Sequence, residues 1–409
     1  MSALGIALKS LGYNVVGSDK VDIFFTDNEL IKNDIKVLNF NEENIDKYKD
    51  YNFIVSYAYD KDNNYEVKRL EELDIKYKYY SEFINEFFKG KMIGVSGSHG
   101  KTTVSKMLAS FLPLSSYIIG DGSGKAYSDN KYFIIEACEY KKHFLNYDFD
   151  YLIINNIDYD HPDYYKNKEE YLNAFIEASK KAKCLICNGD DENCKLIRHD
   201  NKYTFGFNRG NNCLIKILEE SEKGYKVEFK IKRRTYFYEL PYYGKHMLYN
   251  FACVVLLLSL EGLDIKNIAI SNFELPRLRM SERIYKSNII IDDYAHHPTE
   301  IKCIIKAIKQ KYPNMEIVCI FQPHTYTRSI SLKKEFKNVF DEIDECYLEK
   351  TFVSREKYDK IKEKEVKKIF KKCKYLTKDD IDRIKRYENK VILILGAGDI
   401  HYNILKSFS

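Results

Sequence analysis

Six short apolar runs constrain the fold of this chain more than any other feature of its sequence. Each run is rich in aliphatic or β-branched residues, ends in polar or glycine residues, and alternates with helical patterns. Continuous apolar runs of this kind are typical of parallel sheets covered by helices on both faces, which predicts an α/β fold. Ligands of such sheets bind beyond the carboxyl ends of the strands, so we expect the functional residues there. The runs are YFIIE (132–136), YLIINNI (151–157), CLICNGD (184–190), NIIIDD (288–293), EIVCIFQP (316–323) and VILILGAGD (391–399).

Length and composition indicate a globular protein of more than one domain. A chain of 409 residues is long enough for two or three domains, and 44% hydrophobic and 31% charged residues are typical of folded chains. The net charge of +5 reflects a small excess of basic residues, so we expect no nucleic-acid partner. The longest apolar run, near 254–260, is far too short for a bilayer, and no signal-peptide pattern occurs. We therefore expect a cytoplasmic protein with no membrane partner.

The cysteines carry little functional information. Ten cysteines in a chain of this size without a secretion pattern predict reduced thiols. The closely spaced pair Cys184 and Cys187 lies in an apolar stretch that resembles a buried strand. A single CxxC is weak evidence for zinc, so we interpret both as core residues.

The most specific motif is KMIGVSGSHGKTTVSKMLASFL, residues 91–112. It predicts a strand, a glycine loop and a helix that begins with Gly-Lys-Thr. In such loops the backbone N–H groups surround phosphates, the lysine reaches the β- and γ-phosphates, and the threonine hydroxyl ligates Mg²⁺. The strict GxxxxGK[ST] pattern fails, because Val95 stands at its first position. An ordinary glycine turn does not explain the Gly-Lys-Thr, so the motif predicts ATP and Mg²⁺ as cofactors. The expected nucleotide-binding residues of this loop are Gly97, Ser98, His99, Gly100, Lys101, Thr102 and Thr103.

The loop GSHGKTT resembles the phosphate loop of the Mur ligases, which build the peptide stem of the bacterial wall. The resemblance implies a reaction in which ATP converts a carboxylate into an acyl phosphate. An amine then attacks the acyl phosphate and gives an amide, ADP and phosphate. Several later motifs can be compared with the same family.

Two strand ends carry the expected magnesium ligands. A carboxylate beside a phosphate loop can ligate Mg²⁺, and Glu136 follows the run 132–136. The matching glutamate of the family is a magnesium ligand, which implies that role for Glu136 together with Thr102. The segment NNIDYDHPDYY (155–165) resembles the family's NIxxDH, which implies that His161 ligates a second Mg²⁺. Without the resemblance, a strand-end carboxylate or histidine is more often structural.

Two further motifs imply contacts to the nucleotide. YGKHMLYNF (243–251) resembles the family's GxHNxxN, whose last asparagine recognises adenine, and this assigns Asn250 although Met247 replaces the first asparagine. Asparagine suits adenine because it can pair with N6 and N7 together. LPRLRMSERI (275–284) resembles the family's arginine pair, which implies that Arg279 contacts the γ-phosphate, with Leu278 in place of its neighbour.

The motifs IIIDDYAHHPTEI and IFQPHTYTRS gather aspartates, histidines and an arginine at two strand ends. Neither has the HExxH spacing, so a zinc site is the weaker interpretation. Both resemble the Mur ligase that joins L-alanine to UDP-N-acetylmuramate, which implies these two substrates. Asp293 is then expected near the ribose and γ-phosphate, and Tyr294 near the nucleoside. The residues expected to hold the amino acid are His297, His324 and Arg328. The expected catalytic residues are Lys101, Glu136, His161, Arg279 and Asp293.

We expect three domains. Residues 1–88 are interpreted as a Rossmann-like UDP-sugar-binding domain, residues 89–273 as a P-loop ATPase domain with a mostly parallel sheet, and residues 274–409 as a Rossmann-like α/β domain that contacts amino acid and nucleotide. Within the central domain, residues 202–240 alternate in hydrophobicity, which predicts an antiparallel insert. The oligomeric state is expected to be a monomer or homodimer.

The first stretch, MSALGIALKSLGYNVVGSD, predicts a helix followed by a strand. Leu4, Ala7, Leu8 and Leu11 form a helical stripe. The stretch resembles the family's first domain just after its opening strand and glycine turn, so we expect the true start upstream, an incomplete sheet and unpaired strand edges. Ser18 and Asp19 match the UDP-sugar-binding part loosely.

Three alternatives share parts of this pattern. A sister ligase would use another amino acid or a peptide. A degenerate paralogue would hold nucleotide or sugar with impaired turnover. A P-loop NTPase that drives a partner would hydrolyse ATP without an amino acid, although such a switch has no use for a carboxylate-binding arginine.

Overall fold

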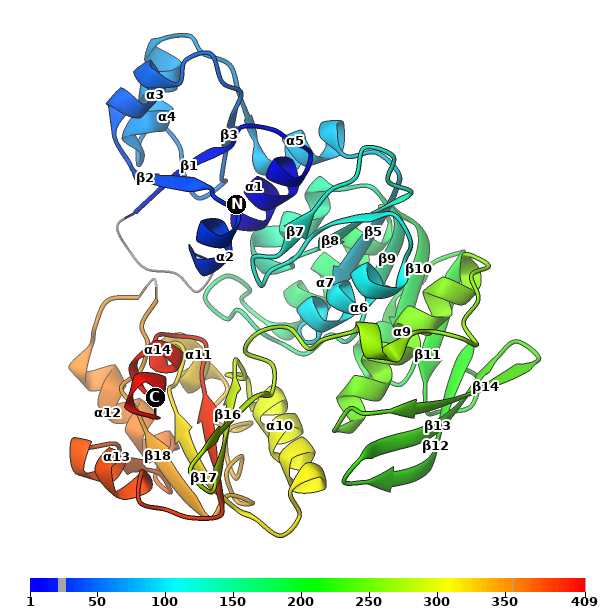
Figure 1. Ribbon diagram of the computed structural model, residues 1–409, viewed down its shortest axis with the longest axis vertical. Coiled ribbons are helices and arrows are strands. Elements are labelled where there is room, and N and C mark those ends of the chain that lie inside the picture. The colour runs from blue at the N-terminus through cyan, green and yellow to red at the C-terminus, as the bar shows by residue number, and fades with distance from the viewer. Residues whose placement is uncertain (21–26, 355, 409) are drawn as a thin grey trace.

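The computed structural model describes residues 1–20, 27–354 and 356–408 and arranges them in three domains (Figure 1). The predicted α/β class is confirmed, because parallel strands alternate with helices along the chain. The predicted boundaries after residues 88 and 273 stay predictions. The first domain contains α1 (Ser2–Ser10), β1 (Val16–Asp19), α2 (Asp27–Lys32), β2 (Lys36–Asn39), α3 (Glu42–Lys47), β3 (Phe53–Val55), α4 (Tyr65–Glu72), β4 (Tyr77–Tyr79) and α5 (Tyr80–Phe87).

The predicted helix and strand at the start of the chain are confirmed as α1 and β1. Leu4 and Ala7 of the helical stripe are buried, and they join a hydrophobic cluster formed largely by the central domain. Among the described residues, β1 pairs only with β2 and β3 only with β4, both in parallel. The expected unpaired strand edges are therefore present, and the strands of this domain form two separate pairs.

The central domain is built on one sheet of ten strands in the order β14-β13-β12-β11-β10-β9-β5-β8-β6-β7. The predicted apolar runs 132–136, 151–157 and 184–190 form β8, β9 and β10 at its centre. The elements are β5 (Lys91–Ser96), α6 (Lys101–Phe111), β6 (Ser115–Ile118), β7 (Gly124–Lys125), β8 (Tyr132–Glu136), η1 (Tyr140–Asn146), β9 (Phe149–Ile154), α7 (Lys168–Ser179), β10 (Ala182–Asn188), α8 (Glu192–Leu196), β11 (Lys202–Gly206), β12 (Cys213–Ser221), β13 (Gly224–Ile231), β14 (Arg234–Leu240), α9 (Lys245–Leu260) and η2 (Ile270–Asn272).

The prediction of an antiparallel insert over 202–240 is only partly right. β12, β13 and β14 are antiparallel, but β11 pairs in parallel with β10, and β12 pairs in parallel with β11. All four strands extend the central sheet. Alternating hydrophobicity reports which face of a strand is covered and not the direction of its neighbour, so the sequence pattern could not separate the two arrangements.

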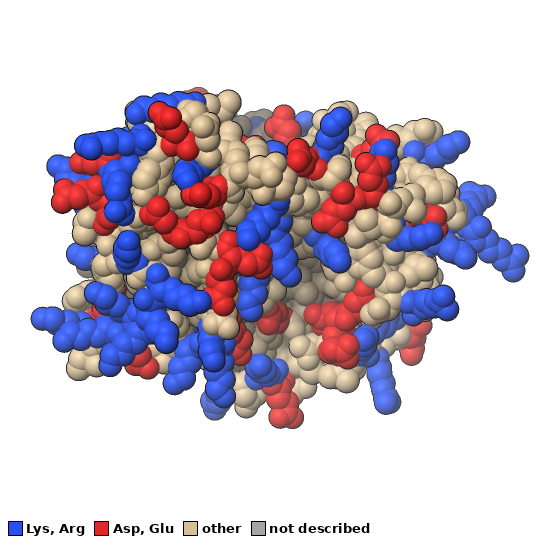
Figure 2. All heavy atoms as spheres, turned by 90° about the horizontal axis from the view of Figure 1, so that it is seen from below, with Lys and Arg blue, Asp and Glu red and all other residues tan. Residues whose placement is uncertain are grey.

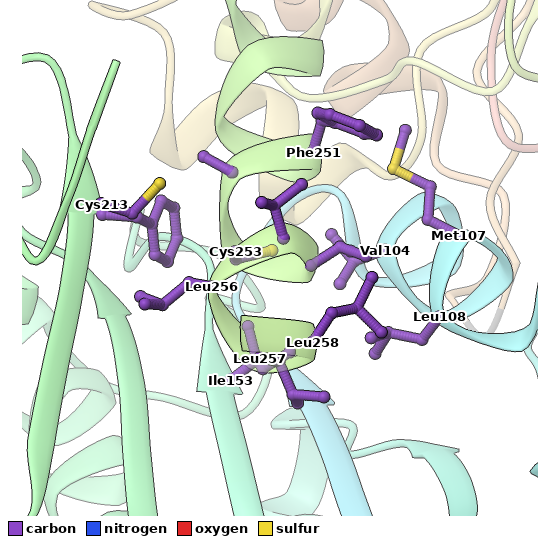
Figure 3. Packing of buried hydrophobic residues seen from close by; sticks show 14 of the residues in the cluster. Val104, Met107, Leu108, Ile153, Cys213, Phe251, Cys253, Leu256, Leu257 and Leu258 are labelled. Carbon is purple, nitrogen blue, oxygen red and sulfur yellow. The ribbon is translucent and has the colours of Figure 1, made fainter. Parts of the chain in front are cut away.

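Helix α9 fills the core of the central domain. Figure 3 shows Phe251, Leu257 and Leu258 of α9 packed between the strands of the sheet and Val104 and Leu108 of α6. Residues 251–258 of the helix are all buried, so α9 is apolar around its whole circumference. This packing fixes the start of α6, which carries the Gly-Lys-Thr, against the sheet.

The third domain has a sheet of six strands in the order β15-β16-β20-β17-β18-β19, parallel except for the pair β15–β16. The predicted runs 288–293, 316–323 and 391–399 form its three central strands. The elements are β15 (Ser281–Tyr285), β16 (Asn288–Asp293), α10 (Pro298–Lys311), β17 (Glu316–Phe321), α11 (Tyr326–Ser331), β18 (Glu345–Leu348), α12 (Lys360–Ile369), β19 (Lys374–Tyr375), α13 (Lys378–Ile384), β20 (Lys390–Leu395), α14 (Ile400–Asn403) and η3 (Leu405–Phe408).

The prediction that the thiols are reduced is wrong for one pair, because a disulfide joins Cys346 of β18 to Cys373. These cysteines lie 27 residues apart and meet only once β18 and the segment before β19 pack together. Cys184 and Cys187 are buried free thiols in β10, as predicted.

Basic and acidic side chains are interspersed over the face of the molecule drawn in Figure 2. Within the part of the chain that the structure describes, no helix has the length and apolar character needed to cross a membrane.

Candidate active site

The phosphate-loop motif adopts the predicted strand, loop and helix. Residues 97–100 link β5 to α6, and both glycines at the ends of this loop have positive φ, +127° at Gly97 and +85° at Gly100. A Cβ added at Gly100 would lie 2.5 Å from Asn155 Nδ2 and 2.7 Å from Asn250 Oδ1. Only glycine therefore fits here, both sterically and conformationally.

Two asparagines that follow β9 hold the loop in shape. The His99 backbone N–H donates to Asn156 Oδ1 at 2.9 Å, and Asn156 Nδ2 donates back to the His99 carbonyl at 3.0 Å. Asn155 Nδ2 donates to the same carbonyl at 3.1 Å. The Ser98 hydroxyl donates to the Asp158 carbonyl at 2.6 Å. The loop leads into the N-terminus of α6, a position at which the backbone N–H groups of a helix suit a nucleotide phosphate.

Lys101 lies inside the loop and contacts a carboxylate that the sequence reasoning did not select. Its Nζ donates to the Gly97 carbonyl at 2.6 Å and lies 2.9 Å from Glu139 Oε2. Glu139 Oε1 lies 3.4 Å from His161 Nε2. Burial opposes charge on both partners, but the mutual attraction outweighs it, so the pKa of Lys101 is raised and the pKa of Glu139 is lowered. Lys101, Glu139 and His161 therefore form one charged cluster beneath the loop.

The remaining predicted magnesium ligands lie beside this cluster. Glu136 ends β8 and accepts a hydrogen bond from the Gly120 N–H at 2.6 Å. Burial raises the pKa of Glu136, while Lys101 and the Thr102 side chain act in the opposite direction. Thr102 and Glu136 thus meet as predicted, and His161 reaches the site through Glu139. Carboxylate and hydroxyl oxygens next to a phosphate loop are the donors that Mg²⁺ prefers, so the residues present fit this ion.

Asn250, the residue expected to read adenine, lies buried in the first turns of α9. Its Oδ1 accepts a hydrogen bond from Asn155 Nδ2 at 2.7 Å, and its Nδ2 lies 3.7 Å from Met247 Sδ. In this arrangement Asn250 supports the loop through Asn155. Thr103, another predicted loop residue, is also buried at the start of α6.

Arg279, Asp293 and Tyr294 come together at the edge of the third domain. The Arg279 guanidinium lies 5.4 Å from the centre of the Tyr294 ring. Both neighbours of Arg279 have positive φ, +58° at Leu278 and +48° at Met280, a backbone strain that is common at functional sites. Asp293 is buried and accepts the N–H of Met280 at 2.7 Å. Burial raises the pKa of Asp293 to about 6, although Arg279 acts in the opposite direction.

The predicted amino-acid residues also come together, and they meet the central domain. Arg328 donates from Nε to Asp160 Oδ1 at 2.8 Å and from Nη2 to Asp160 Oδ2 at 3.3 Å. Arg328 Nη1 lies 2.6 Å from the His324 carbonyl and 2.9 Å from His324 Nδ1. Burial lowers the pKa of His324 to about 4, helped by Arg328, and also lowers the pKa of His297. These imidazoles are therefore neutral near pH 7.

The loop and the third domain are in direct contact. His99 Nε2 lies 3.2 Å from Asp158 Oδ2, and His99 Nδ1 lies 3.3 Å from Glu300 Oε1 in α10. His297, at the N-cap of the same helix, lies 3.5 Å from Asp158 Oδ2 through its Nδ1. Desolvation opposes the charge on His99, but Glu300 and Asp158 raise its pKa to about 9.

Ser18 and Asp19 lie at the carboxyl end of β1 in the first domain. The Ser18 hydroxyl donates to Glu66 Oε2 at 2.5 Å, and the Asp19 carboxylate accepts the N–H of Lys20 at 2.8 Å. Glu66 is buried at the start of α4 and also accepts from Asn44 Nδ2 at 2.6 Å. Both predicted residues thus stand at the edge where a parallel sheet binds its ligand.

Four polar residues of the site were missed by sequence reasoning: Asn155, Asn156, Glu139 and Glu300. One of them carries a recognisable signal. Glu300 is the third helical residue after the N-cap His297 and closes a capping box with it. Glu139 stands three residues after Glu136, but its approach to Lys101 depends on the left-handed backbone of residues 141 and 142 that follows. The sequence gives no sign of that conformation.

Three domain models of one family match this chain in order along the sequence. The model described as "Mur ligase family, catalytic domain" matches residues 1–92, "Mur ligase middle domain" matches 123–258, and "Mur ligase, glutamate ligase domain" matches 277–398. The UDP-N-acetylmuramate–L-alanine ligase of Streptococcus sanguinis (strain SK36) is 37% identical over 414 residues, which cover 98% of this chain and 93% of the relative. That of Streptococcus gordonii (strain Challis) is 37% identical over 413 residues with the same coverage.

A solved structure shares the whole fold. The UDP-N-acetylmuramate–alanine ligase of Thermotoga maritima superposes with a TM-score of 0.78 at 23% identity, over 100% of this chain and 95% of that one. Its three-domain α/β architecture is therefore the architecture of this protein. Because three domain models match in order and relatives at 37% identity span nearly the whole length, this chain belongs to the Mur ligase family.

Proposed function

We propose that this protein is an ATP-dependent ligase that joins L-alanine to UDP-N-acetylmuramate in the synthesis of peptidoglycan precursors. One observation carries the proposal: the phosphate loop contacts the third-domain motif that carries His297 and Glu300, and Arg328 reaches into the central domain. A phosphate-binding loop and a buried arginine suited to a carboxylate thus share one site. An NTPase without an amino-acid substrate would not need this arrangement.

The charged residues suit phosphoryl transfer to the muramate carboxylate. Lys101 and Arg279 would stabilise the charge on the γ-phosphate while the carboxylate attacks it. Thr102, Glu136 and His161 would hold the metal, with Glu139 keeping Lys101 and His161 in place. Mg²⁺, when bound, supplies charge neutralisation at the phosphate oxygens. Asp293 and Tyr294 would contact the nucleoside, and Asn250 would approach the adenine from below the loop.

The third domain suits capture of the amino acid. Arg328 would bind the alanine carboxylate through two parallel hydrogen bonds. The amine must lose a proton to solvent before it attacks the acyl phosphate, and His297 and His324 are neutral imidazoles that add no positive charge beside it and can accept a hydrogen bond from it. The resulting amide bond forms as phosphate leaves. Because nucleotide and amino-acid residues lie in different domains, closure between the domains is required for each turnover.

The first domain, with Ser18 and Asp19 at the end of β1, would bind the UDP-sugar. We further infer a cytoplasmic protein that is a monomer or homodimer and uses neither nucleic acid nor membrane as a partner. A ligase of this type needs ATP and the UDP-linked sugar together, and both are available in the cytoplasm.

The proposal is tested by alanine-dependent ADP formation. ADP release is measured with ATP, Mg²⁺ and UDP-N-acetylmuramate against a panel of amino acids and peptides. We expect L-alanine to be preferred, and preference for another substrate would identify a sister ligase. ADP release without any amino acid would favour an NTPase, and binding without turnover a degenerate paralogue.

A pair of lysine variants ties the reaction to the loop. Lys101→Ala is expected to abolish alanine-dependent ADP release, because the γ-phosphate loses its cation. Lys106→Ala is the matched control, since Lys106 lies on the same helix and pairs with Asp121 at 3.1 Å instead of the loop. If the Lys101→Ala variant retains alanine-dependent ADP release, the phosphate loop has no part in the mechanism.

A further inference from the structure

His99, Asp158 and His297 form a cluster with the spacing of a metal site. One ligand atom from each residue lies within 4.8 Å of the other two. His99 Nε2 and His297 Nδ1 lie 3.2 Å and 3.5 Å from the same oxygen, Asp158 Oδ2. A tetrahedral zinc ion with bonds of about 2.0–2.1 Å separates its ligand atoms by about 3.3 Å. The distances from Asp158 Oδ2 to the two histidine nitrogens are already close to this separation.

The ring nitrogens that do not face Asp158 are both held by acceptors. His99 Nδ1 lies 3.3 Å from Glu300 Oε1, and His297 Nε2 lies 3.3 Å from the Tyr159 carbonyl. His297 Nδ1 accepts the Thr299 N–H at 3.3 Å, so it carries a lone pair, which a metal ion would take over from this hydrogen bond. Metal-binding histidines characteristically donate their second N–H to a carboxylate or a backbone carbonyl, which fixes the ring.

The ligating carboxylate is oriented in the same way. The Thr299 hydroxyl donates to Asp158 Oδ2 at 2.5 Å. The Asp158 side chain is 38% exposed, so water can complete the coordination. Two imidazoles and one carboxylate favour zinc and similar transition metals over Mg²⁺, which prefers oxygen ligands. This cluster is also separate from Thr102, Glu136 and His161.

We propose that His99, Asp158 and His297 bind one transition-metal ion, such as Zn²⁺, that bridges the phosphate loop and the third domain. Binding to His99 Nε2 breaks the N–H bond that faces Asp158, the proton is released to solvent, and the ion takes its place. Because the bridge holds the two domains together and withdraws His297 from the amino acid, metal binding inhibits the ligase. The inference concerns regulation of the proposed site, but its test needs no substrate.

The test is Zn²⁺ binding to the metal-stripped full chain, measured by competition with a chromogenic chelator. The wild type is expected to bind one equivalent, and Co²⁺ is expected to give the intense visible absorption of a tetrahedral site. His297→Asn is the informative variant, because asparagine keeps the N-cap of α10 but lacks the imidazole. Asp158→Asn removes the charged ligand with little change in shape. Each should weaken Zn²⁺ binding at least about tenfold.

His199→Ala is the matched control, because His199 contacts the Ala182 carbonyl, far along the chain from the cluster, and should leave Zn²⁺ affinity unchanged. Thermal melts without metal show whether each variant is folded. Unchanged Zn²⁺ affinity in folded His297→Asn and Asp158→Asn would overturn the proposal. Displacement of Zn²⁺ by an excess of Mg²⁺ would also overturn it, because the ion would then occupy the magnesium site. Neither result bears on the proposed function, which alanine-dependent ADP formation tests separately.

Discussion

Under the proposed function, Asp160→Asn is expected to lower the KM for alanine, because Asp160 occupies the guanidinium of Arg328 that would bind the alanine carboxylate. Arginine offers five N–H groups. Among the described residues, Nε and one Nη2–H of Arg328 bind Asp160, and Nη1 binds the carbonyl and Nδ1 of His324. One N–H remains for a substrate carboxylate. Alanine must therefore displace Asp160 to gain a bidentate contact.

The size of the expected change in KM follows from the hydrogen bond to Arg328 that asparagine cannot accept. Both Asp160 and Arg328 side chains are 7% exposed, so the pair is shielded from water. Asparagine keeps one acceptor oxygen for the guanidinium but loses the second, because its NH2 group only donates. A hydrogen bond to a charged group contributes about 1.5–3 kcal/mol, so the competitor is weakened by about this amount, which corresponds to a KM roughly 10- to 150-fold lower. The Asn side chain can still accept the His161 N–H, which the aspartate accepts at 2.7 Å.

The assay varies alanine at saturating ATP and UDP-N-acetylmuramate and follows ADP release. Glu177→Gln is the charge-matched control, because Glu177 pairs with Lys142 at the surface and should leave the KM for alanine unchanged. Arg328→Lys should raise this KM, since a lysine cannot make the bidentate contact. If Asp160→Asn raises the KM for alanine or leaves it unchanged, Asp160 positions Arg328 and does not compete with the substrate.

Three further predictions concern the loop, the third domain and the disulfide. Gly100→Ala should abolish ADP binding in calorimetry, because the added Cβ would meet two asparagine side chains. Gly210→Ala is the control, because Gly210 has a similar positive φ but nothing within 4 Å of an added Cβ. It should cost only about 1–2 kcal/mol of stability and leave ADP binding intact. The pKa of Asp293 is raised from 3.8 to about 6, so between these pH values the folded state holds a proton that the unfolded state loses. The free energy of unfolding should therefore fall by up to ~3 kcal/mol as the pH rises through this range. Urea unfolding of Asp293→Asn should lack this dependence of the free energy of unfolding on pH. The Cys346–Cys373 bridge closes a loop in the unfolded chain, and its reduction releases this loop, so reduction should lower the free energy of unfolding by about 3–4 kcal/mol. Equal melting temperatures with and without reductant would contradict this.

The sequence could predict the strands of this fold better than their partners. Runs 132–136 and 288–293 match β8 and β16 residue for residue, because a strand buried on both faces must be continuously apolar. The direction of β11 was not predictable, since hydrophobic alternation carries no information about its neighbour. The Cys346–Cys373 bridge was missed for a related reason, because its partners meet only through packing that no local pattern records.

The site was predictable where a motif is local and not where it joins distant segments. The phosphate loop lies in one stretch of chain, so its glycines and Lys101 could be identified from spacing alone. Arg328 and Asp160 are 168 residues apart, and the sequence shows two polar residues with no sign that they pair. A family resemblance implies the role of a matched residue, but it does not show which side chain contacts that residue when no substrate is bound.

The segment 158–161 contacts both the phosphate-loop region and the third domain. Asp158 faces His99 and His297, Asp160 binds Arg328, and His161 contacts Glu139 beneath the phosphate loop. His161 has a positive φ of +57°, which costs about 1–3 kcal/mol in a non-glycine residue and persists because its neighbours hold both sides of the turn. A shift of this turn that moves His161 toward a metal must also move the carboxylate that binds Arg328. Under the proposed function, occupancy of the phosphate loop and binding of alanine to Arg328 are therefore coupled through one short turn, and a substitution that shifts the backbone of this turn should change the binding of both ligands.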